Sequence, residues 1–132
     1  MNDIQISKNF KLSEFESPDN KEVKLHEKLL ELLQELRDEI GEPVIVNSGF
    51  RTKEYNDKIG GAKKSKHMEG IASDISLNNL DYSDVELAIL IKNIAERIGI
   101  NSDNLGLGYG VTFLHVDIRG LAGYSSPAEW EY

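Results

Sequence analysis

The sequence has 132 residues, enough for one domain with a real core and too few for two ordinary domains. Its formal net charge of −8 argues against a general nucleic-acid binder, because such proteins carry a basic face. The chain has no cysteine, which excludes disulfides, thiolate metal ligands and a cysteine nucleophile. No stretch approaches the roughly 20 apolar residues of a membrane helix, and the N-terminal residues lack the pattern of a secretory signal.

The N-terminal part predicts an arm followed by a long helix. Residues 1–16 are expected to form an irregular arm that packs onto the body. Ser17-Pro18-Asp19 predicts a helix start, since proline suits the first turn and Ser or Asp can cap free N–H groups. Gly41 and Pro43 end the helix. Its apolar stripe, at helical spacing, consists of Leu25, Leu29, Leu32, Leu33, Leu36 and Ile40.

The middle of the chain alternates short strands with loops. Residues 43–47 are β-branched and bounded by turn formers, which predicts a strand, and a turn over residues 48–51 follows it. A short helix is expected over residues 52–59 and a flexible loop over residues 60–65. Residues 71–77 predict a second strand.

The last third predicts a capped helix and a hairpin. Ser83 and Glu86 have the spacing of a capping box, and the helix they open ends at Gly99. Its apolar face is expected to consist of Val85, Ala88, Ile91, Ile94, Ala95 and Ile98. The glycine-spaced residues 105–110 lead into a strand over residues 111–118, and residues 120–132 form a C-terminal tail. The prediction is therefore a single α+β domain, with two core helices packed on a small, mainly antiparallel sheet.

The strand over residues 111–118 carries the first candidate functional residues. Alternate side chains of a strand share a face. The two faces are Leu114, Val116 and Ile118 on the apolar side, and Phe113, His115 and Asp117 on the other. A histidine beside a carboxylate indicates either a functional pair or an exposed ion pair.

The second strand offers a matching set. His67 precedes it, Asp74 lies within it between the small residues Ala72 and Ser76, and Gly70 permits a bend that brings His67 over Asp74. Two imidazoles and one carboxylate, here His67, His115 and Asp74, match a catalytic zinc site with an open fourth position. Zinc in such a site lowers the pKa of water.

Three sequence blocks give a more specific signal. Ser48-Gly-Phe-Arg51, Ser65-x-His67-x-x-Gly70-x-Ala72-x-Asp74 and His115-Val-Asp117 occur in this order. This pattern resembles the zinc D-alanyl-D-alanine carboxypeptidase family, which includes phage L-alanyl-D-glutamate endolysins and murein endopeptidases and shares its metal-site architecture with hedgehog signalling domains. The resemblance runs from about Val44 to Arg119, and it implies a hedgehog/DD-peptidase-like fold.

The resemblance implies roles for individual residues. His67, Asp74 and His115 match the zinc ligands of the family. Arg51 matches an arginine that faces the scissile carbonyl or the substrate carboxylate, where it would stabilise negative charge. Ser65 matches a serine beside the substrate. The alternative for Arg51 is a surface ion pair, and the alternative for Ser65 is a loop serine or a helix cap.

One position departs from the family pattern. Many members have an acidic general base three residues before the last histidine, where this chain has Thr112. Asp117 is the predicted replacement; it could instead orient His115, or the domain could bind zinc with little activity. Glu69 is a more distant candidate. Tyr109 is expected to line the cleft and bind substrate, with simple packing as the alternative.

These observations predict a monomeric zinc metallopeptidase that hydrolyses stem or cross-link peptides of peptidoglycan, with Asp117 and Arg51 as catalytic residues. Nucleic acid and membrane are not expected as partners. The N-terminal residues favour synthesis in the cytoplasm and action at the wall as a phage lysin or virion enzyme. The alternatives are a zinc-containing but non-catalytic wall-binding domain and a metal-free structural protein of a virion.

Overall fold

The computed structural model describes residues 2–132, so Met1 of the predicted arm lies outside the described part. Within that part, five strands form one sheet in the order β1-β2-β4-β3-β5. The strands are β1 (Val46–Ser48), β2 (Ala72–Ser76), β3 (Gly106–Tyr109), β4 (Phe113–Asp117) and β5 (Ala128–Glu131). All neighbours pair antiparallel except β3 and β5, which run parallel. The predicted α+β class and the mainly antiparallel sheet are confirmed.

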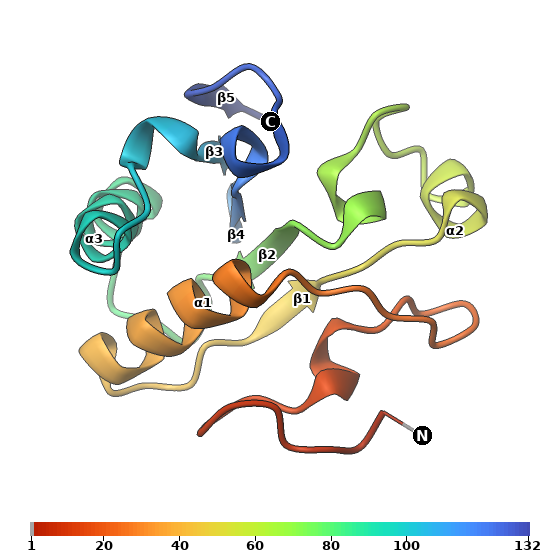
Figure 1. Ribbon diagram of the computed structural model, residues 1–132, viewed down its shortest axis with the longest axis horizontal. Coiled ribbons are helices and arrows are strands. Elements are labelled where there is room, and N and C mark those ends of the chain that lie inside the picture. The colour runs from red at the N-terminus through yellow and green to blue at the C-terminus, as the bar shows by residue number, and fades with distance from the viewer. Residues whose placement is uncertain (1) are drawn as a thin grey trace.

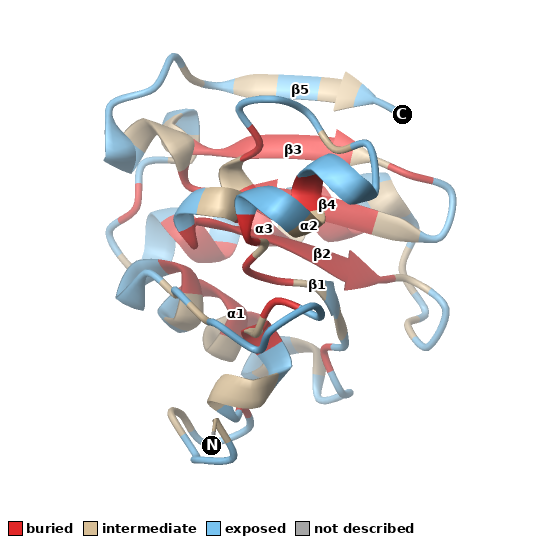
Figure 2. Ribbon diagram, turned by 90° about the vertical axis from the view of Figure 1, so that its right-hand side faces the viewer, coloured by how far each residue is buried: buried red, intermediate tan, exposed pale blue. Residues whose placement is uncertain are grey.

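Two long helices, α1 (Glu27–Ile40) and α3 (Asp84–Arg97), cover one face of the sheet (Figure 1). The short helix α2 (Lys53–Lys58) and the 3-10 turn η2 (Lys66–Glu69) lie on the opposite side. Figure 2 shows that β2, β3 and β4 are buried between these layers. The main core fills the space between the long helices and the sheet, and the opposite side of the sheet is left for a site. No helix among residues 2–132 is long and apolar enough to cross a membrane.

The first long helix starts later than the sequence suggests. α1 begins at Glu27, after His26, whose exposed ring accepts a hydrogen bond from the backbone of Lys28. The predicted start at Ser17-Pro18-Asp19 is wrong. The side chains of Ser17 and Asp19 hydrogen-bond to each other and to Thr52, so they fasten the arm to the first residue before α2 and do not cap a helix.

The second long helix confirms its predicted cap but not its whole apolar face. Ser83 and Glu86 form the capping box, and Gly99 follows the helix with a left-handed φ of 86°. Val85, expected in the core, is 54% exposed, whereas Leu87 is fully buried. The buried stripe is centred on Leu87 and Ile91, which turns Val85 toward solvent.

The other predicted elements are present with shifted ends. β1 starts three residues later than expected, and the hairpin of β3 and β4 is confirmed. The predicted tail, residues 120–132, contains most of the 3-10 turn η4 (Arg119–Ala122) and the whole of β5. Two further 3-10 turns are η1 (Leu12–Phe15) in the arm and η3 (Ser102–Asn104) before β3.

Candidate metal centre

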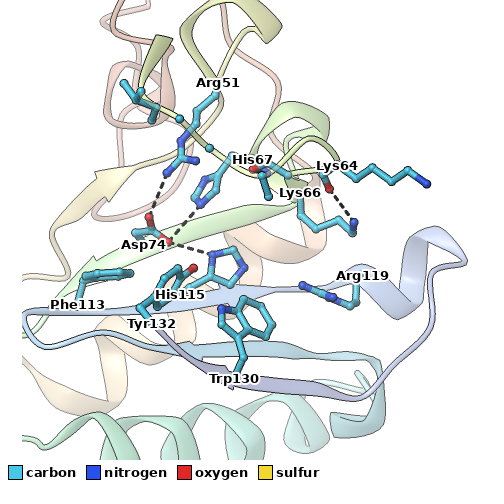
Figure 3. A pocket seen from close by; sticks show the side chains of 15 residues that line it. Arg51, Lys64, Lys66, His67, Asp74, Phe113, His115, Arg119, Trp130 and Tyr132 are labelled. Atoms are coloured by element: carbon cyan, nitrogen blue, oxygen red, sulfur yellow. Dashed lines mark hydrogen bonds and ion pairs between the residues drawn. The ribbon is translucent and has the colours of Figure 1, made fainter. Parts of the chain in front are cut away.

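Three side chains predicted as metal ligands meet at the floor of a cleft of about 480 Å³ on the face opposite α1 and α3. His67 comes from η2, Asp74 from β2 and His115 from β4, and Asp74 lies directly across from His115 in the antiparallel pair. One oxygen of Asp74 is 3.2 Å from His67 Nε2 and 3.0 Å from His115 Nδ1 (Figure 3). One ligand atom from each residue lies within 4.8 Å of the others.

The turn that carries His67 is fixed by its neighbours. Ser65 precedes η2, and its hydroxyl accepts a hydrogen bond from the backbone N–H of His67. Gly70 ends the turn with φ 71°, and a Cβ there would lie 2.6 Å from the carbonyl oxygen of Lys24. The bend expected at Gly70 is therefore present, and no side chain fits at this position.

Each imidazole has a defined nitrogen available for a metal. His67 Nδ1 is 2.8 Å from the carbonyl oxygen of Gly49, and because a carbonyl only accepts, Nδ1 carries a proton and Nε2 is the nitrogen that a metal would take. His115 Nε2 is 2.7 Å from a carboxylate oxygen of Asp117, so a proton held on Nε2 leaves Nδ1 as the nitrogen that a metal would take. These two nitrogens, His67 Nε2 and His115 Nδ1, hydrogen-bond to Asp74, and a metal would bind them in place of those bonds.

The carboxylates of the site are held in their charged form. Burial raises the pKa of Asp74, but hydrogen bonds from His115 and His67 lower it more, so this pKa lies well below its usual range. Burial likewise raises the pKa of Asp117, and the bonds to His115 and Arg119 again outweigh it, so this pKa is also lowered. Both residues stay negatively charged at neutral pH.

This donor set fits a zinc ion. Zinc accepts imidazole nitrogen and carboxylate oxygen in tetrahedral sites, and catalytic sites keep one position open. The two available imidazole nitrogens and the Asp74 carboxylate converge beside the cleft, so the fourth direction has access to a ligand.

The sequence model of the Peptidase M15 family matches residues 6–117 of this chain. The chain belongs to the Peptidase M15 family. A curated relative, the zinc D-Ala-D-Ala carboxypeptidase of Streptomyces albus G, is 34% identical over 68 residues, which is 51% of this chain and 27% of the relative. The match thus spans about a quarter of the relative's length.

Arg51 of this M15 domain lies at the rim of the metal site, where the sequence predicted it. Its guanidinium donates to Ser48 and Asn56 and approaches Asp74 to 3.4 Å. These contacts hold the cation beside the ligands and leave it lining the cleft (Figure 3). Ser65 also lines the cleft while it caps η2, so the two interpretations of Ser65 are compatible.

Asp117 lies behind His115. Its side chain is 0% exposed, and its oxygens accept hydrogen bonds from His115, from the Arg119 guanidinium and from the Arg119 backbone. Thr112, at the position of the family's acid, is exposed in the β3–β4 turn, and Glu69 is exposed and accepts a hydrogen bond from Tyr124. Among residues 2–132, Asp74 is the one carboxylate that lines the cleft.

Tyr109 lies elsewhere than the sequence suggested. Its register partner in β4 is Leu114, so it faces the core side of the sheet, where it packs against the core and reaches Glu129. Tyr109 was expected to line the cleft, but it lies on the opposite face of the sheet. Neighbouring residues of a strand point to opposite faces, so a prediction that is wrong by one residue puts the side chain on the wrong face.

The aromatic side chains that do line the cleft of the M15 domain come from other positions. They are Phe113, Trp130 and Tyr132, and the cation Arg119 accompanies them. Phe113 follows from the alternation of β4. Trp130 and Tyr132 lie in the predicted tail, residues 120–132, but the alternation of Ala128-Glu-Trp-Glu-Tyr132 is typical of a half-exposed strand and could have identified them.

Proposed function

We propose that this domain is a zinc peptidase that hydrolyses amide bonds in the peptides of bacterial peptidoglycan. The observation that carries this proposal is the convergence of His67, Asp74 and His115 beside the Arg51 guanidinium in one open cleft. Family membership and the zinc D-Ala-D-Ala carboxypeptidase of Streptomyces albus G support the same chemistry.

The residues of the chain have distinct parts in this reaction. Zinc, when bound, supplies a Lewis acid and lowers the pKa of water. Arg51 is placed to bind the oxygen of the scissile carbonyl and to stabilise its negative charge as water adds. Ser65 offers a hydroxyl at the rim for the substrate backbone.

Asp117 has an orienting part in this proposal. Its buried carboxylate holds His115 with Nδ1 toward the metal position, and it does not itself line the cleft. The Gly49 carbonyl does the same for His67. This assignment selects the orienting role from the alternatives that the sequence left for Asp117.

A second function has one observation in its favour. Among the described residues, no carboxylate other than Asp74 lines the cleft, so the usual acidic proton carrier of a peptidase is missing there. A zinc-containing wall-binding domain without turnover fits this feature.

The experiment that separates the two functions uses purified peptidoglycan. The zinc-loaded protein should release amino groups, a chelator should abolish the release, and mass spectrometry of the muropeptides should identify the bond as D,D, L,D or L-Ala–D-Glu. Binding to peptidoglycan with zinc present and no release would overturn the peptidase and support the binding domain.

Three other predictions stay predictions. They are a phage lysin or virion setting, a monomeric state, and the absence of nucleic-acid partners. Sedimentation of the purified protein tests the second directly.

A further inference from the structure

The glycines of β3 create space on the cleft side of the sheet. Gly108 pairs with His115, and Gly106 pairs with Asp117, so both lie on the face that carries the metal site. A Cβ at Gly106 would lie 2.5 Å from Arg119 and 2.6 Å from Asp117, and a Cβ at Gly108 would lie 2.7 Å from the Trp130 ring. The glycine spacing of residues 105–110 thus lets larger side chains lie across β3.

The side chains in this space come from residues 119–132, here called the C-terminal segment. The Trp130 ring lies 5.1 Å from the His115 ring, and the Arg119 guanidinium lies 4.9 Å from the centre of the Trp130 ring. The Tyr132 ring is 5.0 Å from Phe113 and 6.2 Å from Trp130. Figure 3 shows Trp130 and Tyr132 side by side below the three metal ligands.

These aromatic rings are not part of the core. Tyr132 is 68% exposed, and Trp130 is half-buried on the cleft. β5 faces two ways, because Glu129 points toward α3 and pairs with Lys92, whereas Trp130 faces the cleft. The Glu129–Lys92 pair and the pairing with β3 hold the strand from its other face and its edge, and the two rings are left on the cleft side.

The segment also lies outside the family match, which ends at residue 117. The ligands, Arg51 and Ser65 all fall within the matched region, whereas Arg119, Trp130 and Tyr132 follow it. The surface that these three residues add to the cleft therefore lies beyond the part of the chain that the family model describes.

We propose that Trp130 and Tyr132 form a substrate-binding wall of the cleft. This wall contacts the uncharged, apolar surface of the peptidoglycan peptide beside the scissile amide. This inference rests on the proposed function. Exposed aromatic rings next to a reactive centre gain free energy when an apolar group covers them, and the Tyr132 hydroxyl adds one hydrogen-bonding group. Arg119 is bound to Asp117, so the wall selects for shape and apolar surface more than for charge.

The test compares variants on glycan-free stem peptides, released from peptidoglycan by an amidase. Trp130→Ala should raise KM by about tenfold or more with kcat within about threefold, and Trp130→Phe should restore most of the loss. The zinc Kd should stay within about threefold of wild type, because Trp130 donates no hydrogen bond to a ligand. Glu129→Ala is the matched control: it weakens β5 on its other face and should leave KM unchanged.

A second readout does not need a variant. Trp130 is the only tryptophan of the chain, so its emission reports on the cleft alone. Stem peptides mixed with the zinc-loaded wild-type protein should change this emission in a saturable way. This measurement keeps the proposal testable if Trp130→Ala does not fold.

The outcomes separate the two proposals. Hydrolysis by wild type with an unchanged KM in Trp130→Ala, or an equal rise in KM in Glu129→Ala, overturns the wall and leaves the peptidase intact. A saturable emission change without hydrolysis supports the wall and overturns the peptidase. If Trp130→Ala raises KM only on sugar-bearing muropeptides, the two rings bind glycan, and the proposed contact with the peptide is overturned.

Discussion

The carboxylate of Asp117 reaches His115 and Arg119 and is sealed from the cleft, which suits a residue that orients a ligand. We expect Asp117→Asn to weaken zinc binding by about 10- to 100-fold, because the imidazole loses its charged partner. Competition with a chelating dye measures this Kd. A general base would give the opposite pattern, an unchanged zinc Kd with kcat lower by about 10²–10⁴-fold. Asp57→Asn, on the exposed side of α2, serves as the control.

Ser73 presents a different residue-scale feature on β2. Its hydroxyl is fully buried and has no hydrogen-bond partner among the described residues. A buried polar group without a partner costs free energy, so Ser73→Ala should leave the free energy of unfolding unchanged or raise it by about 1 kcal/mol. Urea unfolding measures this value. A loss of more than about 1 kcal/mol would show that the hydroxyl has a partner in solution.

At the scale of elements, hydrophobic periodicity predicted correctly which side chains of β4 are buried in the core. The alternation of β4 placed Leu114 in the core and His115 on the opposite face, as observed. The helix start at Ser17 failed because its side chains bond to Thr52, 35 residues away, and such a contact leaves no local pattern. β5 was missed because a parallel edge strand depends on its distant partner β3.

The candidate site also contains residues that the sequence predicted and residues that it did not. The three residues predicted as zinc ligands come from the motifs and meet in the structure, and Arg51 lies beside them. Tyr109 shares its face with Leu107, so its place on the core side follows only once residues 106–109 are recognised as a strand. The glycines of β3 became informative only once Trp130 was seen to lie over them.

The junction between the arm and α2 predicts a pH effect on stability. Hydrogen bonds from Ser17 and Thr52 lower the pKa of Asp19, so the folded state favours its charged form. This contribution is fully present above the unfolded pKa, near 4, and is lost as pH falls through the lower folded pKa. We expect Asp19→Asn to flatten the fall in urea midpoint as pH drops below about 4. An unchanged pH profile would contradict this role.

For the whole molecule, the layered arrangement separates stability from chemistry. α1 and α3 bury the core against one face of the sheet (Figure 2). The cleft occupies the other face. The sheet carries both functions because β2 and β4 alternate aliphatic side chains toward the helices with Asp74 and His115 toward the cleft. Substitutions of cations at the rim of the cleft, such as Lys64, should therefore change activity with little effect on folding.

The charge of the molecule is also divided between its surfaces, and this predicts a salt effect. The net charge is −8, yet four cations line the cleft: Arg51, Lys64, Lys66 and Arg119. Stem peptides carry carboxylates, so the positive rim should attract them and salt should screen the attraction. We expect KM to rise severalfold between about 50 and 300 mM NaCl, and Lys64→Gln to reduce this dependence at unchanged zinc affinity. Lys8→Gln, in the N-terminal arm, is the matched control. A salt-independent KM for wild type, or an equal effect of both variants, would show that local charge at the cleft has no part in substrate capture.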